Sequence, residues 1–207
     1  FRSGQYVETS WDDAEGGLKP ETIEVRFRSV SGSDQILVQK DDQFALKLKD
    51  NGSTDNNGTV SFMLSGSDGY KEISSSALPI YDGDFYSVMV RRMIGSDNTS
   101  VSQSYELNVG KYDSSRSKIH LYSTTTMDVS QAASSSFSNA WTGSGNVYIG
   151  GSTDIADVGV QFSGSIMEYR HWTETLNTSS FKNHVGNPKA YDGNTVSSSY
   201  NNLVLRY

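Results

Sequence analysis

The chain has 207 residues, of which 35% are hydrophobic and 11% aromatic, and its formal net charge is −7. The length suits one large all-β domain, and the aromatic side chains can bury enough apolar surface to form its core. The negative charge argues against nucleic-acid binding, the lack of cysteine excludes disulfides and thiolate metal sites, and no apolar run approaches the ~20 residues needed to span a bilayer.

Short stretches in which apolar and polar residues alternate predict β-strands along most of the chain. In the clearest of them, 22–30, Ile23, Val25 and Phe27 point to one side. The residues between them are charged, which is the pattern of a half-buried strand. The predicted strands are 5–9, 22–30, 36–39, 44–48, 60–64, 70–73, 85–92, 105–109, 118–123, 147–149, 162–172 and 203–207.

Turn residues separate these strands. The segment 50–58 is the most polar run, and it fits either a calcium loop, because hard cations prefer several oxygen ligands, or a hairpin turn. Asn57-Gly58 is a strong hairpin signal and the acidic spacing does not fit an EF-hand, so the hairpin is favoured. Gly150-Gly151 is expected to end a strand in a turn with positive φ. The Ser/Thr-rich segment 124–139 has no clear period and is predicted to be a long loop or an irregular edge.

A single short helix is predicted near the C-terminus. Asn177 or Thr178 supplies its N-cap, and Gly186 with Pro188 ends it. Its apolar side is expected to consist of Phe181, His184 and Val185.

The predicted elements indicate an all-β fold, a two-sheet antiparallel β sandwich or jelly roll with one short helix. Turn signals recur about every 8 to 12 residues, and no βαβ alternation is present, so a parallel sheet is not expected. We expect one domain over residues 1–207. The chain starts abruptly at Phe1, in what reads as a strand that continues through 5–9, and we therefore expect it to be part of a longer protein.

Five segments, in this order and spacing, resemble the concanavalin A-like, laminin-G-like jelly roll. They are 1–8, 22–27, 82–90, 148–151 and 162–176. Two further segments, 111–119 and 181–194, resemble laminin-G-like parts of virion structural proteins of tailed phages, especially marine ones. The resemblance implies an extracellular module on the virion surface, in a tail, fibre or capsid. Such a module would bind host-surface glycans or neighbouring virion proteins, and a second copy of the chain is a further partner left open.

The same fold also hosts glucanases, so an enzyme has to be weighed. Those enzymes use a Glu-x-Asp-x-(x)-Glu strand that places two carboxylates about 5 Å apart for retaining hydrolysis. The nearest run here, from Glu168 to Glu174, lacks the middle acid, so Glu168 is expected to be a solvated or salt-bridged strand residue. We therefore predict no enzymatic activity. The alternatives left open are a polysaccharide-cleaving enzyme of this fold and a secreted cell-surface adhesion domain.

The three histidines do not predict a metal site. His120, His171 and His184 lie on different predicted elements and have no ligand spacing. His171 alternates with apolar residues, so a hydrogen-bonded core position is favoured over a metal ligand.

The laminin-G-like resemblance also implies a possible calcium ion at the rim of the sandwich, held by acids from two loops. The acids in suitable loops are Asp82, Asp84, Asp154 and Asp157. Aspartate is also an ordinary turn former, and that interpretation is favoured.

A glycan-binding surface needs aromatic rings beside polar groups, because the rings stack on the C–H faces of sugars while Asn and Asp bind the hydroxyls. The aromatic residues in or beside loops with such neighbours are Trp11, Tyr70, Tyr112 and Trp141. The alternative for each is a packing role over one end of the sandwich.

Overall fold

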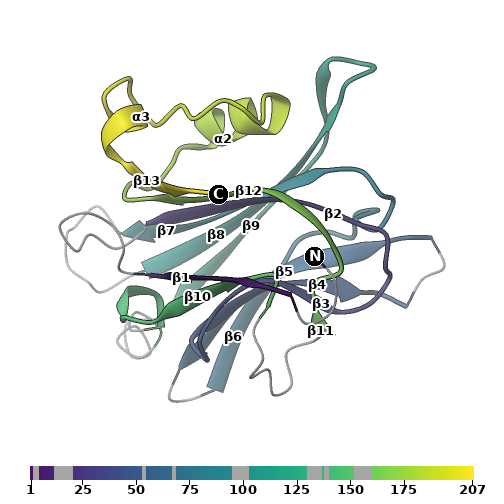
Figure 1. The fold of residues 1–207 in the computed structure, drawn as a ribbon, viewed down its shortest axis with the longest axis horizontal. Helices are drawn as coiled ribbons and strands as arrows, with labels where there is room; N and C mark the ends of the chain where they lie inside the picture. The colour runs from purple at the N-terminus through teal and green to yellow at the C-terminus, as the bar shows by residue number, and fades with distance from the viewer. Residues whose placement is uncertain are drawn as a thin grey trace.

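The protein is a two-sheet β sandwich (Figure 1). The computed structural model describes residues 1, 5–11, 21–52, 55–66, 69–94, 103–129, 137, 140–151 and 160–207. Each sheet is built from strands distant in sequence, and every pairing between consecutive members of the two sheet orders given below is antiparallel. The predicted fold class is therefore confirmed.

The first sheet begins at the strand nearest the N-terminus and ends at a strand with an exposed face. Its order is β1 (Val7–Ser10), β10 (Asn146–Ile149), β3 (Gln35–Lys40), β4 (Phe44–Asp50), β5 (Gly58–Gly66) and β6 (Gly69–Ser74). The two-residue strand β11 (Val160–Gln161) pairs with β3 in the parallel sense.

The second sheet has six strands and carries helices α2 (Thr178–Gly186) and α3 (Ser198–Asn201) on its outer side (Figure 1). Its order is β13 (Leu203–Arg206), β12 (Gly164–Trp172), β2 (Thr22–Ser29), β7 (Tyr86–Ile94), β8 (Gln103–Asp113) and β9 (Lys118–Val129).

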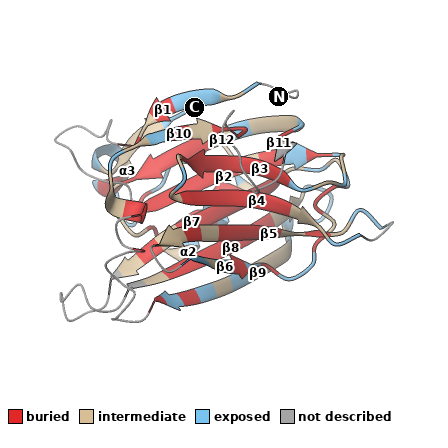
Figure 2. Ribbon diagram, turned by 90° about the horizontal axis from the view of Figure 1, so that it is seen from below, coloured by how far each residue is buried: buried red, intermediate tan, exposed pale blue. Residues whose placement is uncertain are grey.

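The core fills the space between the two sheets, and burial is greatest along the central strands (Figure 2). Ile23, Val25 and Phe27 of β2 point into it, as their alternation predicts. Burying large apolar and aromatic side chains stabilises such a fold by roughly 1.5–3 kcal/mol for each side chain.

Helix α2 (Thr178–Gly186) covers part of the outer face of the second sheet (Figure 1). The Asn177 side chain caps it by accepting a hydrogen bond from the Ser180 amide at 2.7 Å. Phe181 and Val185 are buried against a second, smaller apolar cluster that includes Trp172. The prediction of this helix, its cap and its buried side is confirmed.

The sequence did not predict two other short helical segments. Helix α3 (Ser198–Asn201) precedes β13, and residues 140–142 form a helical turn. Among the described residues, no helix has the length and apolar character required to cross a membrane.

Two turn predictions are confirmed. Asp50 pairs with Gly58 at the open end of the β4–β5 hairpin, so the polar run connects two antiparallel strands. Gly150 and Gly151 end β10 with φ of 91° and 94°, a conformation that costs glycine little.

Two expectations are wrong. The segment beginning at Thr124, predicted to be a long loop or an irregular edge, is a regular strand as far as Val129 at the edge of the second sheet, because β9 extends along the full length of β8. Its threonines are β-branched, which suits a strand, but their polarity hides the alternation of apolar and polar residues that predicts a strand from the sequence. The strand β2 was expected to be half-buried, with one face in solvent, but most residues on both of its faces are buried. Glu24 on its outer side is only 5% exposed because α2 lies over that face.

Candidate binding surface

Glu24 is the centre of a buried polar network on the outer face of the second sheet. Its Oε2 accepts a hydrogen bond from Trp172 Nε1 at 2.9 Å, and its Oε1 lies 2.8 Å from His184 Nδ1. Arg170 Nη1 lies 3.4 Å from Oε2. These contacts join β2, β12 and α2, so the helix is fixed by polar bonds as well as by apolar packing.

A second carboxylate, Glu168 on β12, lies beside this network. Arg206 donates two hydrogen bonds of 2.8 Å to it, and Arg170 Nε donates a third at 3.2 Å. Burial opposes the charge of Glu168, but the arginines outweigh it and hold the pKa of this carboxyl below its ordinary value. The prediction of a salt-bridged strand residue is confirmed. A carboxylate held ionised in this way does not suit the proton-donor role in glycoside hydrolysis.

A small cavity of about 20 Å³ lies between α2 and the outer faces of β2, β7 and β12. This volume is large enough for about one water molecule. Its polar lining consists of Glu24, Arg26, Ser87, Glu168, Arg170 and His184. Two nitrogen atoms in that lining, Arg26 Nε and His184 Nε2, are buried and have no hydrogen-bond partner within the part of the chain that the structure describes.

The segment between α2 and β13 is held by polar contacts. Ser180 Oγ donates to the Gly193 carbonyl at 3.0 Å, and the Asn194 amide donates to Glu174 Oε1 at 3.1 Å. The Gly193 amide donates to Ser199 Oγ at 2.8 Å. Gly193 is itself buried among these groups, and a Cβ at this position would collide with Glu174 and with the backbone of Ser198.

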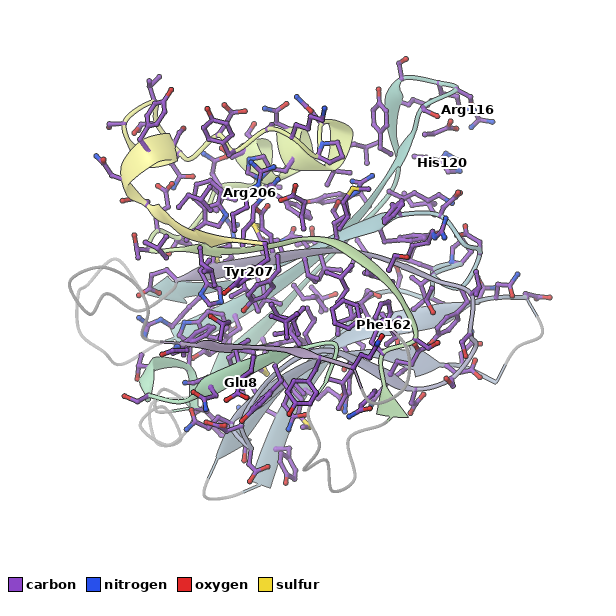
Figure 3. All side chains as sticks on the ribbon, in the orientation of Figure 1. Glu8, Arg116, His120, Phe162, Arg206 and Tyr207 are labelled. Atoms are coloured by element: carbon purple, nitrogen blue, oxygen red, sulfur yellow. The ribbon has the colours of Figure 1, made fainter. Side chains whose placement is uncertain are left out.

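This segment presents two exposed tyrosines, Tyr191 and Tyr200, which we name the tyrosine platform. They are 42% and 71% exposed, and their ring centroids lie 6.2 Å apart at an interplanar angle of 73°. Hydrogen bonding to Glu168 is the main cause that raises the pKa of Arg206, and the nearby Tyr191 phenol adds to it. Figure 3 shows Arg206 on the side of the second sheet that carries α2 and α3. The platform and the cavity therefore lie on the same side of the molecule.

Two of the aromatic residues predicted to bind a ligand are core residues. Trp11 and Trp141 are both 0% exposed. Their ring centroids lie 5.3 Å apart, and Trp11 Nε1 donates to the Trp141 carbonyl at 2.7 Å. No ring face is open to a sugar, so the packing alternative describes both residues. A tryptophan beside a polar loop gives the same sequence signal in either role.

The other two predicted aromatics lie on different sheets. Tyr70 of β6 is 71% exposed at the edge of the first sheet. Tyr112 of β8 is partly buried beside Gly186, at the end of α2. The structure therefore does not bring the four predicted aromatics into one surface.

The predicted calcium ligands Asp82 and Asp84 already surround a cation. Lys111 Nζ lies 2.6 Å from a carboxylate oxygen of each. Burial opposes the charge of Lys111, but its hydrogen bonds to the two aspartates outweigh this and raise its pKa. The lysine ammonium thus takes the place between the carboxylates, and the pair does not fit a calcium ion. Asp154 and Asp157 lie outside the described residues.

The histidines are separated, as predicted, and the described residues contain no group of three or more metal-binding side chains. His120 lies on the β8–β9 hairpin that projects beyond the sandwich (Figure 3). His171 is 2% exposed in the core and bonds the Tyr169 hydroxyl. Burial lowers the pKa of His171 to about 3.

The sequence missed the contact between Glu24 and His184. The signal was present, because alternation placed Glu24 on the polar side of β2 and the helical period placed His184 on the buried side of α2. A histidine on a buried helix face needs a polar partner, and a strand carboxylate is a suitable one.

No protein-family model matches the sequence, and no curated protein matches it significantly. The laminin-G-like resemblance therefore stays a prediction.

Proposed function

We propose that this protein is a non-enzymatic adhesion module that binds glycans through the tyrosine platform. The laminin-G-like resemblance supports a place on a virion surface, where the ligand would be a glycan of the host. The observation that carries the proposal is the exposure of Tyr191 and Tyr200 on a segment held by hydrogen bonds.

The chemistry of the platform suits a sugar. A pyranose ring has an apolar C–H face that packs on an aromatic ring, and tyrosine combines such a ring with a polar tip. Tyr191 and Tyr200 stand nearly edge to face, so they offer two differently oriented surfaces to a chain of sugar units.

Polar side chains suited to sugar hydroxyls lie near Tyr191 in the chain. Asn187 is exposed and carries both a donor and an acceptor, whereas the exposed Asn194 uses its side chain to accept from the Asn177 amide and to donate to the Thr175 carbonyl. Asn183 and Asp192 are also exposed and bond each other, which orients the Asp192 carboxylate beside Tyr191 in the chain. Because the segment is already ordered by hydrogen bonds, binding would cost little conformational entropy.

The state of Glu168 favours binding over hydrolysis. It is the acid that comes nearest to a glucanase pattern, yet three hydrogen bonds from arginines keep it ionised. Glu174, the other acid of that run, accepts a hydrogen bond from the backbone that supports the platform. Both acids are accounted for by structural contacts.

A glycan array tests the proposal. We expect the protein to bind a subset of glycans, and the double variant Tyr191→Ala/Tyr200→Ala to lose at least about tenfold in affinity, since each tenfold is 1.4 kcal/mol. Tyr70→Ala is the matched control, because it removes an equally exposed tyrosine from the other sheet. Thermal melts of both variants check the fold.

Two results would contradict the proposal. A flat array, together with a fixed position of the chain in the lattice of an intact particle, would leave assembly with other virion proteins as the role. Release of product from β-glucans or marine polysaccharides that is lost in Glu168→Gln would establish an enzyme.

A further inference from the structure

Arg26 forms no direct ion pair within the described part of the chain. Its Nη1 donates to Ser87 Oγ at 3.0 Å and lies 3.4 Å from the Val185 carbonyl, and both acceptors are neutral. The two nearby carboxylates bond other cations, Glu24 with Arg170 and Glu168 with Arg206. Burial is the main cause that lowers the pKa of Arg26, the neighbouring Arg170 adds to it, and the charge of Glu168 acts in the opposite direction.

Arg26 and His184 both line the cavity under α2, and each has a buried nitrogen, Arg26 Nε and His184 Nε2, without a hydrogen-bond partner among the described residues. The His184 residue is 3% exposed, and its other ring nitrogen is held by Glu24. The Arg26 Nε–H can only donate. An oxygen atom in the cavity would therefore accept a hydrogen bond from Arg26, and a second from His184 when the imidazole is protonated.

The charge of that oxygen decides between two ligands. A neutral hydroxyl would satisfy the hydrogen bond of Arg26 but leave its charge uncompensated. A carboxylate oxygen would satisfy both, and hydrogen bonds between charged groups are about twice as strong as neutral ones. Arg28 lies two residues further along the same face of β2 and adds positive charge beside Arg26, because both guanidinium groups lie over the Phe85 ring.

We propose that this cavity receives a carboxylate oxygen of an acidic sugar, a uronic acid unit of the glycan that the tyrosine platform binds. The inference rests on the proposed function and names the class of its ligand. The cavity and the tyrosine platform are linked by neighbouring residues. Pro188 lines the cavity three residues before Tyr191, and Glu168 of the lining bonds Arg206, which lies near Tyr191. Since the whole protein carries a charge of −7, this local cationic group is what would admit an anionic chain.

The test compares oligogalacturonate with oligogalactose of the same length and linkage by isothermal titration calorimetry. The two probes differ at C6, where one has a carboxylate and the other a hydroxymethyl group. We expect the native protein to bind the acidic probe at least about tenfold more tightly, a difference of 1.4 kcal/mol. Arg26→Gln is expected to remove that preference and leave the affinity for the neutral probe unchanged.

Arg28→Gln is the matched control, because it removes a cation from the same strand and the same Phe85 ring but not from the cavity. It is expected to keep most of the preference. Arg26→Lys keeps the charge and removes the Nε–H, so this variant is expected to lose part of the preference for the acidic probe. Equal melting temperatures exclude unfolding as the cause, and a shift of the His184 ring signals by galacturonate in the NMR spectrum reports the cavity directly.

The results separate this inference from the proposed function. If both probes bind equally and the platform variant weakens both, the cavity takes no carboxylate and the platform still binds sugar. Binding of neither probe, together with a flat glycan array, removes the proposed function as well. An acidic peptide that competes as well as the oligogalacturonate would overturn the sugar as the ligand.

Discussion

Glu24 of β2 and His184 of α2 are 160 residues apart in the chain, yet His184 Nδ1 lies 2.8 Å from Glu24 Oε1 under the helix. The same carboxylate accepts from Trp172 of β12 and contacts Arg170. One buried acid therefore holds two strands and a helix in place. This contact positions the wall of the cavity and the start of the segment that carries the tyrosine platform.

Glu24→Gln is expected to lower the free energy of unfolding by about 3 kcal/mol, because it removes a charge from a buried and hydrogen-bonded pair. Urea denaturation measures the loss. Lys49→Gln is the control, since the Lys49 side chain is 36% exposed where it pairs with Glu72, and an ion pair at such an exposed position contributes less than about 1 kcal/mol. Equal losses in the two variants would show that the network under α2 does not stabilise the fold.

Millimolar calcium is expected to leave the melting temperature of the native protein unchanged, because Lys111 lies between Asp82 and Asp84. Lys111→Gln leaves two carboxylates close together without a cation, so it is expected to lose about 1–2 kcal/mol. Calcium should restore part of that loss, as differential scanning calorimetry with calcium or a chelator would show. A clear calcium stabilisation of the native protein would contradict this account.

Trp11→Ala is expected to cost about 3–5 kcal/mol of stability, because the ring is fully buried against Trp141 and Phe44. Any loss of glycan binding in this variant should follow unfolding and disappear at lower temperature. Tyr70→Ala, at an exposed position, is expected to stay within about 0.5 kcal/mol of the native protein. A folded Trp11→Ala variant that fails to bind glycan would restore Trp11 as a ligand contact.

Acid is expected to destabilise the protein through His171. In the unfolded chain this histidine takes up a proton near its ordinary pKa of 6.5, whereas burial lowers the pKa of the folded state to about 3. The unfolded state therefore binds more protons between these values, and stability falls as the pH falls through that window.

A comparison with the His171→Gln variant measures how strongly His171 makes stability depend on pH. Below pH 6.5 the native protein should lose stability more steeply than His171→Gln, with the difference approaching about 1.4 kcal/mol per pH unit. Urea titrations between pH 7 and 5 give both slopes. They avoid the range in which carboxylates such as Glu168, whose pKa is lowered, begin to lose their bonds. Parallel slopes would mean that His171 is protonated in the folded protein.

The strand pattern was predictable because each sheet has one face against the core. Ile23, Val25 and Phe27 alternate with charged residues, and only one register places all three inside. The pattern failed at Thr124–Val129 because Thr125, on the same side of β9 as the buried Met127 and Val129, is polar, so no apolar alternation is visible before Met127.

The candidate site was less predictable, because exposure depends on what covers a residue. Trp11 and Tyr200 both lie near polar neighbours in sequence, but one is buried and the other is 71% exposed. No local pattern distinguishes them. Arg26 also looks like an ordinary solvated strand residue until α2 is placed over it and its partners are known.

The sequence by itself determined the all-β class, the limits of most strands, the cap and buried side of α2, and the structural role of His171. These depend on residues within a few positions of one another, through side-chain alternation, turn chemistry and helix capping. Only the tertiary structure decided that Trp11 and Trp141 belong to the core, that Lys111 lies between Asp82 and Asp84, and that Glu24 faces His184. Those outcomes depend on contacts between distant segments, and burial and charge pairing are properties of such contacts.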